Sequence, residues 1–421
     1  MSQLRDDCFA LDDARIPVDQ ALAELKQRMA CVVGRECVPL RAAAGRLLAD
    51  DLIAMHRVPA FTNAAVDGYA LRHADLAADQ ATALPLMTGR SAAGHPSQAR
   101  LAAGHALRVL TGGEMPDGAD SVLMQEDARL DGDRVIVPPG LTLGANRRLA
   151  GEDMQPGQVI VHAGQRLGAR ALAAAAALGH DQLRVHERLR VAVVSTGDEL
   201  IEPGRALVDG GVYDSNRFLL TSLLERMGCG VSDYGIVADD AVAVERTLQQ
   251  AAHNNHVVLT SGGASRGDED HIVRTLERRG SVHFWQIAMK PGRPLAFGTL
   301  DGAMFLALPG NPVAAFVCFL LFARPLLNAL SGAGFPVPER FPLAAAFDWR
   351  KKPGRTEYLR GVRCDRPRAS GSVDRLKREG SGLITVLLAA DGLIEVGHDV
   401  TEVHVGDPLT FLPFDGFGLD A

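Results

Sequence analysis

Short apolar runs alternate with helix-like segments between residues 187 and 331, and this alternation constrains the fold more than any other feature of the chain. The β-branched run RVAVVS at 190–195 precedes a Gly/Asp loop and a segment with leucines on one helical face. Further strands are expected at 234–237, 256–260, 282–288 and 304–308, and helices at 241–252, at 271–279 and from 312. Strands that alternate with helices form a parallel sheet covered on both faces, so one α/β domain is expected here.

The segments on either side of this domain have different patterns. Residues 17–31 predict an amphipathic helix with Asp19 as a possible N-cap, and the Ala-rich stretch 169–178 predicts a second helix. Between these helices, residues 58–150 are rich in turns and short apolar bursts, with Asp131-Gly132-Asp133 as a hairpin-like turn, which predicts a β-rich insertion. After a Pro-rich connector, the chain from 335 predicts a small β domain of barrel type.

Length and charge exclude several classes of protein. The 421 residues are enough for roughly three domains. A net charge of −7, from 44 basic and 51 acidic residues, disfavours an extended nucleic-acid surface. The acidic N-terminal segment has no signal or transit pattern, so a cytoplasmic location is expected. The longest apolar stretch, 312–323, is shorter than the roughly 20 residues that a membrane span needs, so no span is expected. The six cysteines include no C-x-x-C pair, which favours reduced thiols over a zinc site, and Cys318 is expected in the core.

The predicted parallel strands are followed by loops rich in Gly, Ser, Thr or acidic residues. In an open parallel sheet such loops meet at the carboxyl edge, where helix N-termini point free N–H groups outward, so a ligand is expected there. The candidate residues in these loops are Thr196, Gly197, Asp198, Glu199, Asp239, Asp240, Ser261, Gly262, Gly263, Asp268, Asp270, Pro309, Asn311 and Pro312.

This mixture of residue types suggests phosphate chemistry with a divalent cation. Glycines and small hydroxyls let backbone N–H groups approach a phosphate, whereas several carboxylates in the same crevice would repel it. Mg²⁺ resolves this conflict because it binds carboxylate, phosphate and water oxygens together. Lys290 and Arg293 would add fixed positive charge toward an oxyanion.

Each motif taken singly also has a purely structural explanation. Asp198 and Glu199 fit a capped turn, and acids such as Asp268 at a helix start are favoured by the helix dipole alone. Asn311 with Pro312 fits the start of a helix, and the basic residues fit a solvated loop. The arrival of all these motifs at one sheet edge is what favours a functional site.

In this order, the motifs resemble the molybdopterin-binding domain shared by molybdenum-cofactor biosynthesis proteins. The motifs are TGDEL at 196–200, DSN at 214–216, SGG at 261–263 with Gly267, Asp268 and Asp270, KPGRP at 290–294 and PGNP at 309–312. Upstream motifs are similar to the molybdopterin molybdenumtransferase type, MoeA and the gephyrin E domain. These are PAFTNAAVDGYA at 59–70, TGG at 111–113 with GAD at 118–120, and NRR at 146–148 with GED at 151–153.

The resemblance implies an α/β multidomain fold in four parts and a homodimer. The implied parts are a discontinuous, elongated, helical dimerisation domain (1–57 and 151–186), a β-rich insertion (58–150), the molybdopterin-binding α/β domain with a parallel-type sheet (187–331) and a C-terminal β barrel (335–421). In this family, molybdate is the substrate inserted into adenylylated molybdopterin, and the adenylate is hydrolysed with Mg²⁺ as cofactor. The implied protein partners are a molybdopterin adenylyltransferase and cofactor-receiving molybdoenzymes.

The resemblance also implies roles for single residues, in a cleft between the α/β domain of one subunit and the insertion of the other. Glu199, Asp239 and Asp270 would be catalytic and bind the metal, with Asp240 and Asp268 as further metal positions. Thr111 and Asp153 would act from the insertion side. The implied ligand-binding residues are Thr196, Gly197, Asp198, Ser261, Gly262, Gly263, Lys290, Arg293, Pro309, Asn311 and Pro312. We hypothesise that Mg²⁺ polarises the phosphoanhydride while a nearby acid orients the attacking water.

The chain departs from the family pattern at several positions. Thr62 stands where the family motif has an acid, and Ala64 and Val66 replace its Ser and Met. Gln286 replaces a Lys of many members, and Glu269 replaces an aromatic residue. Because a neutral Thr cannot bind metal or take a proton as a carboxylate does, a catalytically weak paralogue that acts as a molybdopterin-binding scaffold is a second hypothesis.

A third hypothesis uses the α/β domain alone, as an adenylyltransferase or a nucleotide pyrophosphatase. Residues 1–186 and 335–421 argue against it, because stand-alone adenylyltransferases lack such segments.

Overall fold

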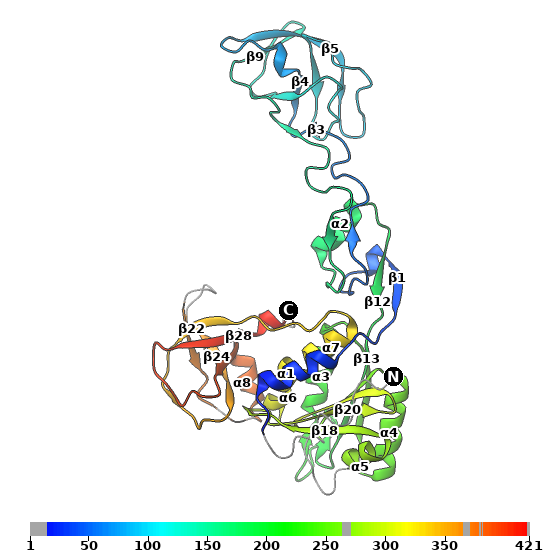
Figure 1. Cartoon of the computed structure of the whole chain (residues 1–421), viewed down its shortest axis with the longest axis vertical. Coiled ribbons are helices and arrows are strands. Elements are labelled where there is room, and N and C mark those ends of the chain that lie inside the picture. The colour runs from blue at the N-terminus through cyan, green and yellow to red at the C-terminus, as the bar shows by residue number, and fades with distance from the viewer. Residues whose placement is uncertain (1–14, 263–270, 365–370, 379, 381, 419–421) are drawn as a thin grey trace. The chain divides into compact units, whose positions relative to one another are not determined.

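The chain divides into two compact units. The computed structural model describes residues 15–262, 271–364, 371–378, 380 and 382–418. Unit 1 comprises Met1–Cys37, Gly45–Ala49 and Arg184–Ala421, and unit 2 comprises Val38–Ala44 and Asp50–Leu183. Figure 1 labels the helices and strands of both units.

A six-stranded sheet in the order β16-β13-β17-β21-β20-β18 forms the centre of unit 1. The neighbouring strands β16 (Gly230–Val237), β13 (Arg190–Thr196), β17 (Val257–Ser261) and β21 (Ala303–Leu308) are parallel. The prediction of a parallel sheet is confirmed for these strands. The remaining edge differs, because β20 (Pro294–Leu300) is antiparallel to β21, and β18 (Gly280–Gln286) is antiparallel to β20. Asp301 and Gly302 both have positive φ and join β20 to β21 in a tight hairpin turn, which enforces the antiparallel pairing.

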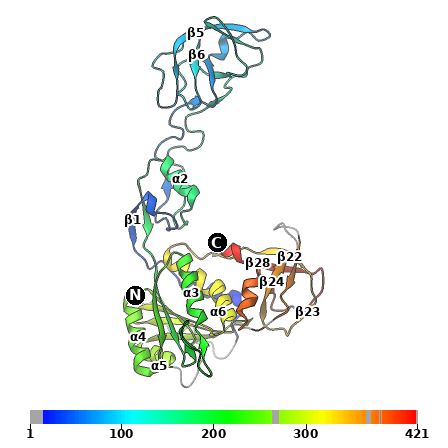
Figure 2. The ribbon, with the colours of Figure 1, turned by 180° about the vertical axis from the view of Figure 1, so that it is seen from behind.

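Helices cover both faces of this sheet, because successive side chains along a strand point to opposite faces. Val191 and Val193 of β13 belong to one core with α3 (Ser215–Arg226) and α6 (Pro312–Cys318). Ala192 and Val194 belong to a second core with α4 (Ala241–Asn254) and α5 (His271–Arg279). Figure 2 shows these helix pairs on the two sides of the sheet.

Helix α1 (Val18–Arg28) packs into the first of these cores. The predicted N-cap at Asp19 is wrong, because the N-cap lies two residues earlier, at Pro17, which makes no side-chain capping bond. Asp19 instead lies in the first turn, where its negative charge interacts favourably with the positive end of the helix dipole.

The helical segment that begins at Pro312 is longer than the apolar run at 312–323. Helix α6, the π-helical segment η4 (Phe319–Ala323) and α7 (Arg324–Ser331) form a continuous stretch of 20 residues. The stretch is long and apolar enough to cross a membrane by length and composition, but 83% of its apolar window is buried inside the protein. The helical stretch continues through Arg324 and Pro325, with Pro325 in the first turn of α7. Arg324 Nε donates to the Phe417 carbonyl oxygen (2.9 Å). This degree of burial is typical of a core helix.

The C-terminal part of unit 1 is a closed five-stranded barrel, which confirms the predicted β barrel. Its strands pair in the order β24 (Thr356–Arg363), β25 (Ser372–Arg375), β22 (Phe341–Ala345), β28 (Pro408–Pro413), β26 (Gly392–Val396) and back to β24. Strand β19 (Met289–Lys290) pairs with β24 and links the barrel to the α/β part. The other elements of this region are β23 (Trp349–Arg350), β27 (Glu402–Val403), α8 (Ile384–Ala389) and η5 (Phe414–Phe417).

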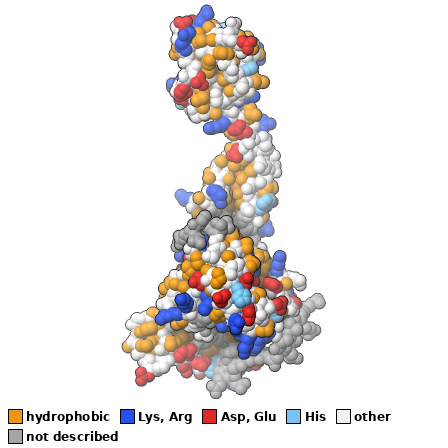
Figure 3. All heavy atoms as spheres, turned by 90° about the vertical axis from the view of Figure 1, so that its left-hand side faces the viewer, with side chains coloured by type: hydrophobic (Ala, Val, Ile, Leu, Met, Phe, Trp, Pro, Cys, Tyr) orange, Lys and Arg blue, Asp and Glu red, His pale blue; other side chains and the backbone are white. Residues whose placement is uncertain are grey.

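Acidic and basic side chains are interspersed on the face of unit 1 that Figure 3 shows, as expected from the 44 basic and 51 acidic residues of the chain.

Unit 2 contains a six-stranded sheet in the order β7-β4-β6-β5-β9-β8. Its strands are β4 (Gly68–Leu71), β5 (Thr82–Ser91), β6 (Ala106–Val109), β7 (Ser121–Met124), β8 (Arg129–Asp131) and β9 (Arg134–Val137). The predicted hairpin at Asp131-Gly132-Asp133 is confirmed, because β8 and β9 are antiparallel on either side of Gly132. The β-rich character of this part of the chain is therefore confirmed.

Short elements complete the chain. Helix α2 (Ala169–Ala177) confirms the predicted Ala-rich helix, and β1 (Arg35–Pro39) pairs with β12 (Gln182–His186). The remaining elements are β2 (Leu52–Ile53), β3 (Asn63–Ala64), β10 (Arg147–Arg148), β11 (Val159–Val161), η2 (Leu40–Ala42) and η3 (His73–Asp75). The finer division of the chain at residues 57, 150 and 186 stays a prediction.

Candidate functional site

The carboxyl ends of the parallel strands lie at one edge of the unit 1 sheet. Ser195 of β13 is in register with Ser261 of β17, which is in register with Leu308 of β21, and Thr196 is in register with Val237 of β16. The loops that follow these strands therefore begin side by side. Along the chain, β16 is added on one side of β13 and β17 on the other, and ligands bind open α/β sheets where the strand order reverses in this way.

The segment that carries Lys290 and Arg293 opens at the same edge. Gln286 ends β18 opposite Pro294, the first residue of β20. Lys290 is half-buried and Arg293 is exposed.

Gly292 holds this segment against α6. Its φ is +95°, and a Cβ at this position would lie 2.4 Å from Sγ of Cys318. Cys318 is fully buried, as predicted, and burial raises the pKa of its thiol to about 12. The close approach of backbone to thiol therefore requires glycine at position 292.

The loop after β13 presents two carboxylates to solvent. Asp198 and Glu199 are both exposed. The carboxylate of Glu199 lies back over Gly197, where an added Cβ would be 2.6 Å from Oε2 of Glu199. The loop is held by β14 (Leu200–Ile201), which pairs with β15 (Val212–Tyr213).

The loop after β16 carries Asp239 and Asp240, which are also exposed. Asp240 caps α4, because its Oδ1 accepts from the backbone N–H groups of Val242 (3.1 Å) and Ala243 (2.9 Å). One oxygen of this predicted metal ligand thus already has a structural role.

The loop after β21 opens α6. Pro309 is buried, Asn311 occupies the N-cap position and Pro312 lies in the first turn of the helix, as the sequence predicted. The exposed side chain of Asn311 makes no capping bond, so it is available to other partners at this edge.

The loop after β17 is described only as far as Gly262, whose N–H donates to the Leu308 carbonyl oxygen at 2.9 Å. Gly263, Asp268 and Asp270 lie outside the described residues, as does Glu269.

The described acids fit the chemistry of Mg²⁺ only in part. Within the residues that the structure covers, no group of three or more His, Cys, Asp or Glu side chains could hold a metal ion. Mg²⁺ commonly takes one or two carboxylates and completes its shell with phosphate and water oxygens. The exposed carboxylates of Glu199 and Asp239 are oxygen donors of the kind that Mg²⁺ uses.

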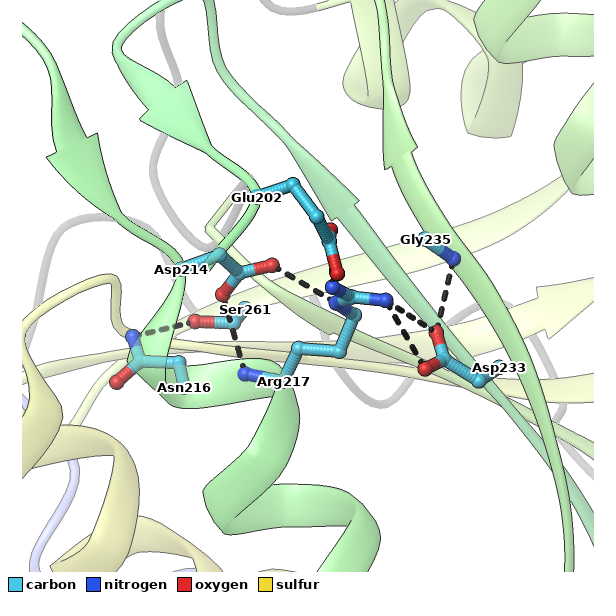
Figure 4. A network of polar contacts seen from close by, with 7 residues as sticks. All are labelled: Glu202, Asp214, Asn216, Arg217, Asp233, Gly235 and Ser261. Carbon is cyan, nitrogen blue, oxygen red and sulfur yellow. Dashed lines mark hydrogen bonds and ion pairs between the residues drawn. The ribbon is translucent and has the colours of Figure 1, made fainter. Parts of the chain in front are cut away.

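Asn216, in the first turn of α3, connects three of the segments at this edge. Its Nδ2 donates to Ser261 Oγ at the end of β17 (2.7 Å) and to the carbonyl oxygen of Gly310 in the loop after β21 (2.6 Å). Asn216 and Ser261 are both buried. Figure 4 shows the Asn216 amide facing the Ser261 hydroxyl.

Arg217, the next residue, lies buried among three carboxylates (Figure 4). Its Nε donates to Asp214 Oδ2 (3.2 Å), its Nη1 donates to Asp233 Oδ2 (3.0 Å), and its Nη2 pairs with Glu202. Burial by itself lowers the pKa of the guanidinium, but the hydrogen bonds and charges of Glu202 and Asp233 raise it further than burial lowers it. Arg217 therefore ties α3 to β16 and to Glu202, which directly follows β14.

The candidate residues Thr111 and Asp153 belong to unit 2. Thr111 donates its backbone N–H and its hydroxyl to Oδ1 of Asp67. Asp153 is exposed, and its N–H donates to the Val58 carbonyl oxygen (3.0 Å). Their contribution to a cleft with the α/β domain stays a prediction.

Models of known protein families match three successive parts of the chain. A model of the MoeA N-terminal region (domain I and II) matches residues 16–179, a probable molybdopterin binding domain matches 192–329, and the MoeA C-terminal region (domain IV) matches 342–414. The molybdopterin molybdenumtransferase of Haemophilus influenzae is 36% identical over 402 residues, which cover 95% of this chain and 99% of that protein. The chain belongs to the MoeA family.

Other members of the MoeA family are also similar to this chain over most of its length. Molybdopterin molybdenumtransferase 2 of Mycobacterium tuberculosis is 32% identical over 91% of this chain and 97% of its own length. The crystal structure of the molybdopterin biosynthesis MoeA protein from Pyrococcus horikoshii OT3 has a TM-score of 0.82 and 29% identity, and the match covers 95% of this chain and 100% of that chain. The predicted family resemblance and the multidomain fold with its α/β domain and C-terminal barrel are confirmed.

Three residues that contact candidate positions or neighbour them have no role assigned by the sequence patterns. Asp214 of the DSN motif caps α3, because its Oδ1 accepts from the Arg217 N–H (3.1 Å). The side chains of Asn216 and Arg217 were not assigned, although the Asp214 and Arg217 spacing of three residues is typical of an ion pair on a helix. Asp67 lies within the PAFTNAAVDGYA motif, and the sequence pattern assigns its side chain no role.

Proposed function

We propose that this MoeA-family chain inserts molybdenum into adenylylated molybdopterin and hydrolyses the adenylate in a Mg²⁺-dependent step, completing the molybdenum cofactor. The observation that carries the proposal is the 36% identity to a molybdopterin molybdenumtransferase over 99% of that protein's length. Molybdate and adenylylated molybdopterin are then the substrates. The matches at 16–179 and 342–414 argue against a stand-alone adenylyltransferase or pyrophosphatase.

Residues at the sheet edge would bind the anionic parts of the substrates. Ser261 offers a hydroxyl, and Lys290 and Arg293 offer positive charge toward phosphate or molybdate oxygens. The residues that would shape the walls of the site are Thr196, Gly197, Asp198, Gly262, Gly263, Pro309, Asn311 and Pro312.

The acidic residues would hold the metal and orient water. Glu199 and Asp239 are the described carboxylates that would bind Mg²⁺, with Asp240, Asp268 and Asp270 as further proposed ligands. When bound, Mg²⁺ would neutralise charge on the phosphoanhydride. Asp270 would orient the attacking water, while Thr111 and Asp153 of a second subunit would close the cleft.

The proposal includes a homodimer in the cytoplasm. It also includes a molybdopterin adenylyltransferase as the source of the substrate and molybdoenzymes as receivers of the cofactor.

The test is AMP release from adenylylated molybdopterin by the full chain with Mg²⁺, with and without molybdate. We expect molybdate to increase the release, and equal release in both conditions would overturn the proposal. Asp270→Ala is expected to abolish release without lowering the unfolding midpoint, because the sequence predicts a loop there and the loss of a loop acid costs little stability. Asp79→Ala, at an exposed acid of unit 2, is the matched control and should release AMP like the wild type.

A second candidate function is a scaffold that binds molybdopterin but turns it over weakly. Thr62 favours it, because the family's acid is absent there and the Thr62 hydroxyl instead accepts from the Ala150 N–H (3.2 Å). Binding of molybdopterin without molybdate-stimulated AMP release would support this function over the first.

A further inference from the structure

The amide group of Asn216 has only one possible orientation. One of its two polar atoms lies 2.6 Å from the carbonyl oxygen of Gly310. A carbonyl oxygen accepts hydrogen bonds and cannot donate, so the amide atom facing it must be the nitrogen, Nδ2. The second hydrogen of the same NH₂ group accounts for the 2.7 Å contact with Ser261 Oγ.

This orientation determines how the Ser261 hydroxyl can be used. Since Ser261 Oγ accepts from Asn216, its own hydrogen must be directed to a different acceptor. Within the described part of the chain, the bond from Asn216 is the only hydrogen bond found for this hydroxyl. Ser261 is 8% exposed, so bulk water has little access to it.

A second unused hydroxyl lies on the neighbouring strand. Ser195 is in register with Ser261, and among the described residues its buried Oγ has no hydrogen-bond partner. Both serines stand at the carboxyl ends of β13 and β17, where the strand order reverses. A hydroxyl that is free to donate at this point suits an anionic oxygen better than a cation or an apolar group.

We propose that Asn216 is a positioning residue: by donating to Ser261 Oγ, it makes Ser261 a hydrogen-bond donor to an anionic oxygen of the substrate. The inference rests on the proposed function, which supplies two groups with anionic oxygens: the molybdopterin phosphate and molybdate. It assigns a role to the DSN motif beyond capping α3.

The same protein contains an Asn and Ser pair with the opposite polarity. Asn255, which is also buried, accepts at Oδ1 from the Ser232 hydroxyl (3.0 Å) and donates at Nδ2 to the Ala251 carbonyl oxygen (3.0 Å). This pair precedes β17 and therefore lies at the amino edge of the sheet. The Ser232 hydroxyl donates its hydrogen to Asn255 and so cannot donate it to a ligand. The pair is therefore a matched control with similar contacts.

The experiment is a double-mutant cycle in the full chain with molybdopterin and molybdate as separate probes. Ser261→Ala and Asn216→Ala are each expected to raise the Kd of one probe by about tenfold or more, the loss typical of a hydrogen bond to a charged group. The double variant should bind no more weakly than Ser261→Ala alone, because Asn216 acts only through that hydroxyl. The probe that loses affinity identifies the oxygen, phosphate or molybdate. Asn255→Ala should lower the unfolding temperature without changing either Kd.

Asn216→Asp provides a second variant of nearly the same shape. Its carboxylate can only accept, so it takes the Ser261 hydrogen, which reverses that bond, and it loses the bond to the Gly310 carbonyl oxygen. We expect its Kd to match that of Ser261→Ala although the serine is still present. A wild-type Kd for this variant would overturn the inference.

The outcomes separate this inference from the proposed function. Additive losses in the cycle, with molybdate-stimulated AMP release in the wild type, would overturn the inference and leave the function intact. Coupled losses without stimulated release would support the inference and overturn the function. A wild type that binds neither probe would overturn both.

Discussion

Thr111 donates two hydrogen bonds to the same oxygen of Asp67, one from its backbone N–H (2.7 Å) and one from its hydroxyl (2.8 Å). The backbone bond and then the hydroxyl bond hold the pKa of Asp67 below its usual value. Asp67 directly precedes β4, so this pair fixes a candidate catalytic residue to the sheet of unit 2.

The Asp67 carboxylate should make the stability of unit 2 sensitive to acid. Because its pKa is lower in the folded state, its contribution is complete above the unfolded pKa of about 4 and is lost as the pH falls through the folded value. Thermal unfolding of the wild type and of Asp67→Asn should differ at neutral pH and converge in acid. Thr111→Val keeps the backbone bond and should give an intermediate result. A difference that persists unchanged at the lowest pH would contradict this assignment.

Removing the Arg217 guanidinium should destabilise unit 1 strongly. Arg217→Gln leaves Asp214, whose side chain is 2% exposed, without its cation, and we expect a loss of about 3 kcal/mol in urea unfolding. The control is Arg278→Gln, because the Arg278 side chain in its ion pair with Glu245 is 59% exposed and such pairs contribute about 0 to 1 kcal/mol. Equal costs for both variants would refute a strong contribution from the buried ion pair of Arg217 with Asp214.

Gly292→Ala should cost more than backbone strain alone. Gly302 has a similar φ of +91° but open space around the Cβ position, so Gly302→Ala measures the strain, which we expect to be about 1 to 2 kcal/mol. At Gly292 the new Cβ also meets Cys318 Sγ at 2.4 Å. Introducing Cys318→Ala into the Gly292→Ala chain should therefore recover part of the lost unfolding free energy. If it recovers none, the contact with the thiol is not what requires glycine.

Thr62→Asp tests whether the missing acid limits turnover. The Thr62 hydroxyl already serves as an acceptor for the Ala150 N–H, a task that a carboxylate oxygen can also perform. If the chain is an active molybdenumtransferase, AMP release by Thr62→Asp should stay close to the wild-type rate. A large increase would instead identify the wild type as the weak scaffold. Thr62→Val, which removes the acceptor, should lower stability and controls for the lost bond.

The sequence predicted those features that depend on local periodicity. Helix α5 has the bounds that were expected, 271–279, because its apolar residues recur at helical spacing. The site loops could be located because parallel strands place their carboxyl ends together. The Asp301-Gly302 turn was present in the sequence as a hairpin signal but was not used, so β20 and the antiparallel edge were missed.

The contacts within the site could not be predicted in the same way. Asn216 meets Gly310 only because α3 and α6 pack on one face of the sheet. Arg217 meets Asp233 because β16 pairs with β13 beneath α3. Such contacts depend on how whole elements pack, which no local pattern in the sequence specifies.

In the closed C-terminal barrel, each strand's backbone N–H and C=O groups are paired by neighbouring strands and so are shielded from pairing with other molecules. Strand β28 pairs with β22 on one side and β26 on the other. A chain that lacks Pro408–Pro413 would leave both of those strands with an unpaired backbone edge. Such edges recruit strands from other molecules, so loss of this single segment would favour aggregation rather than a slightly smaller barrel.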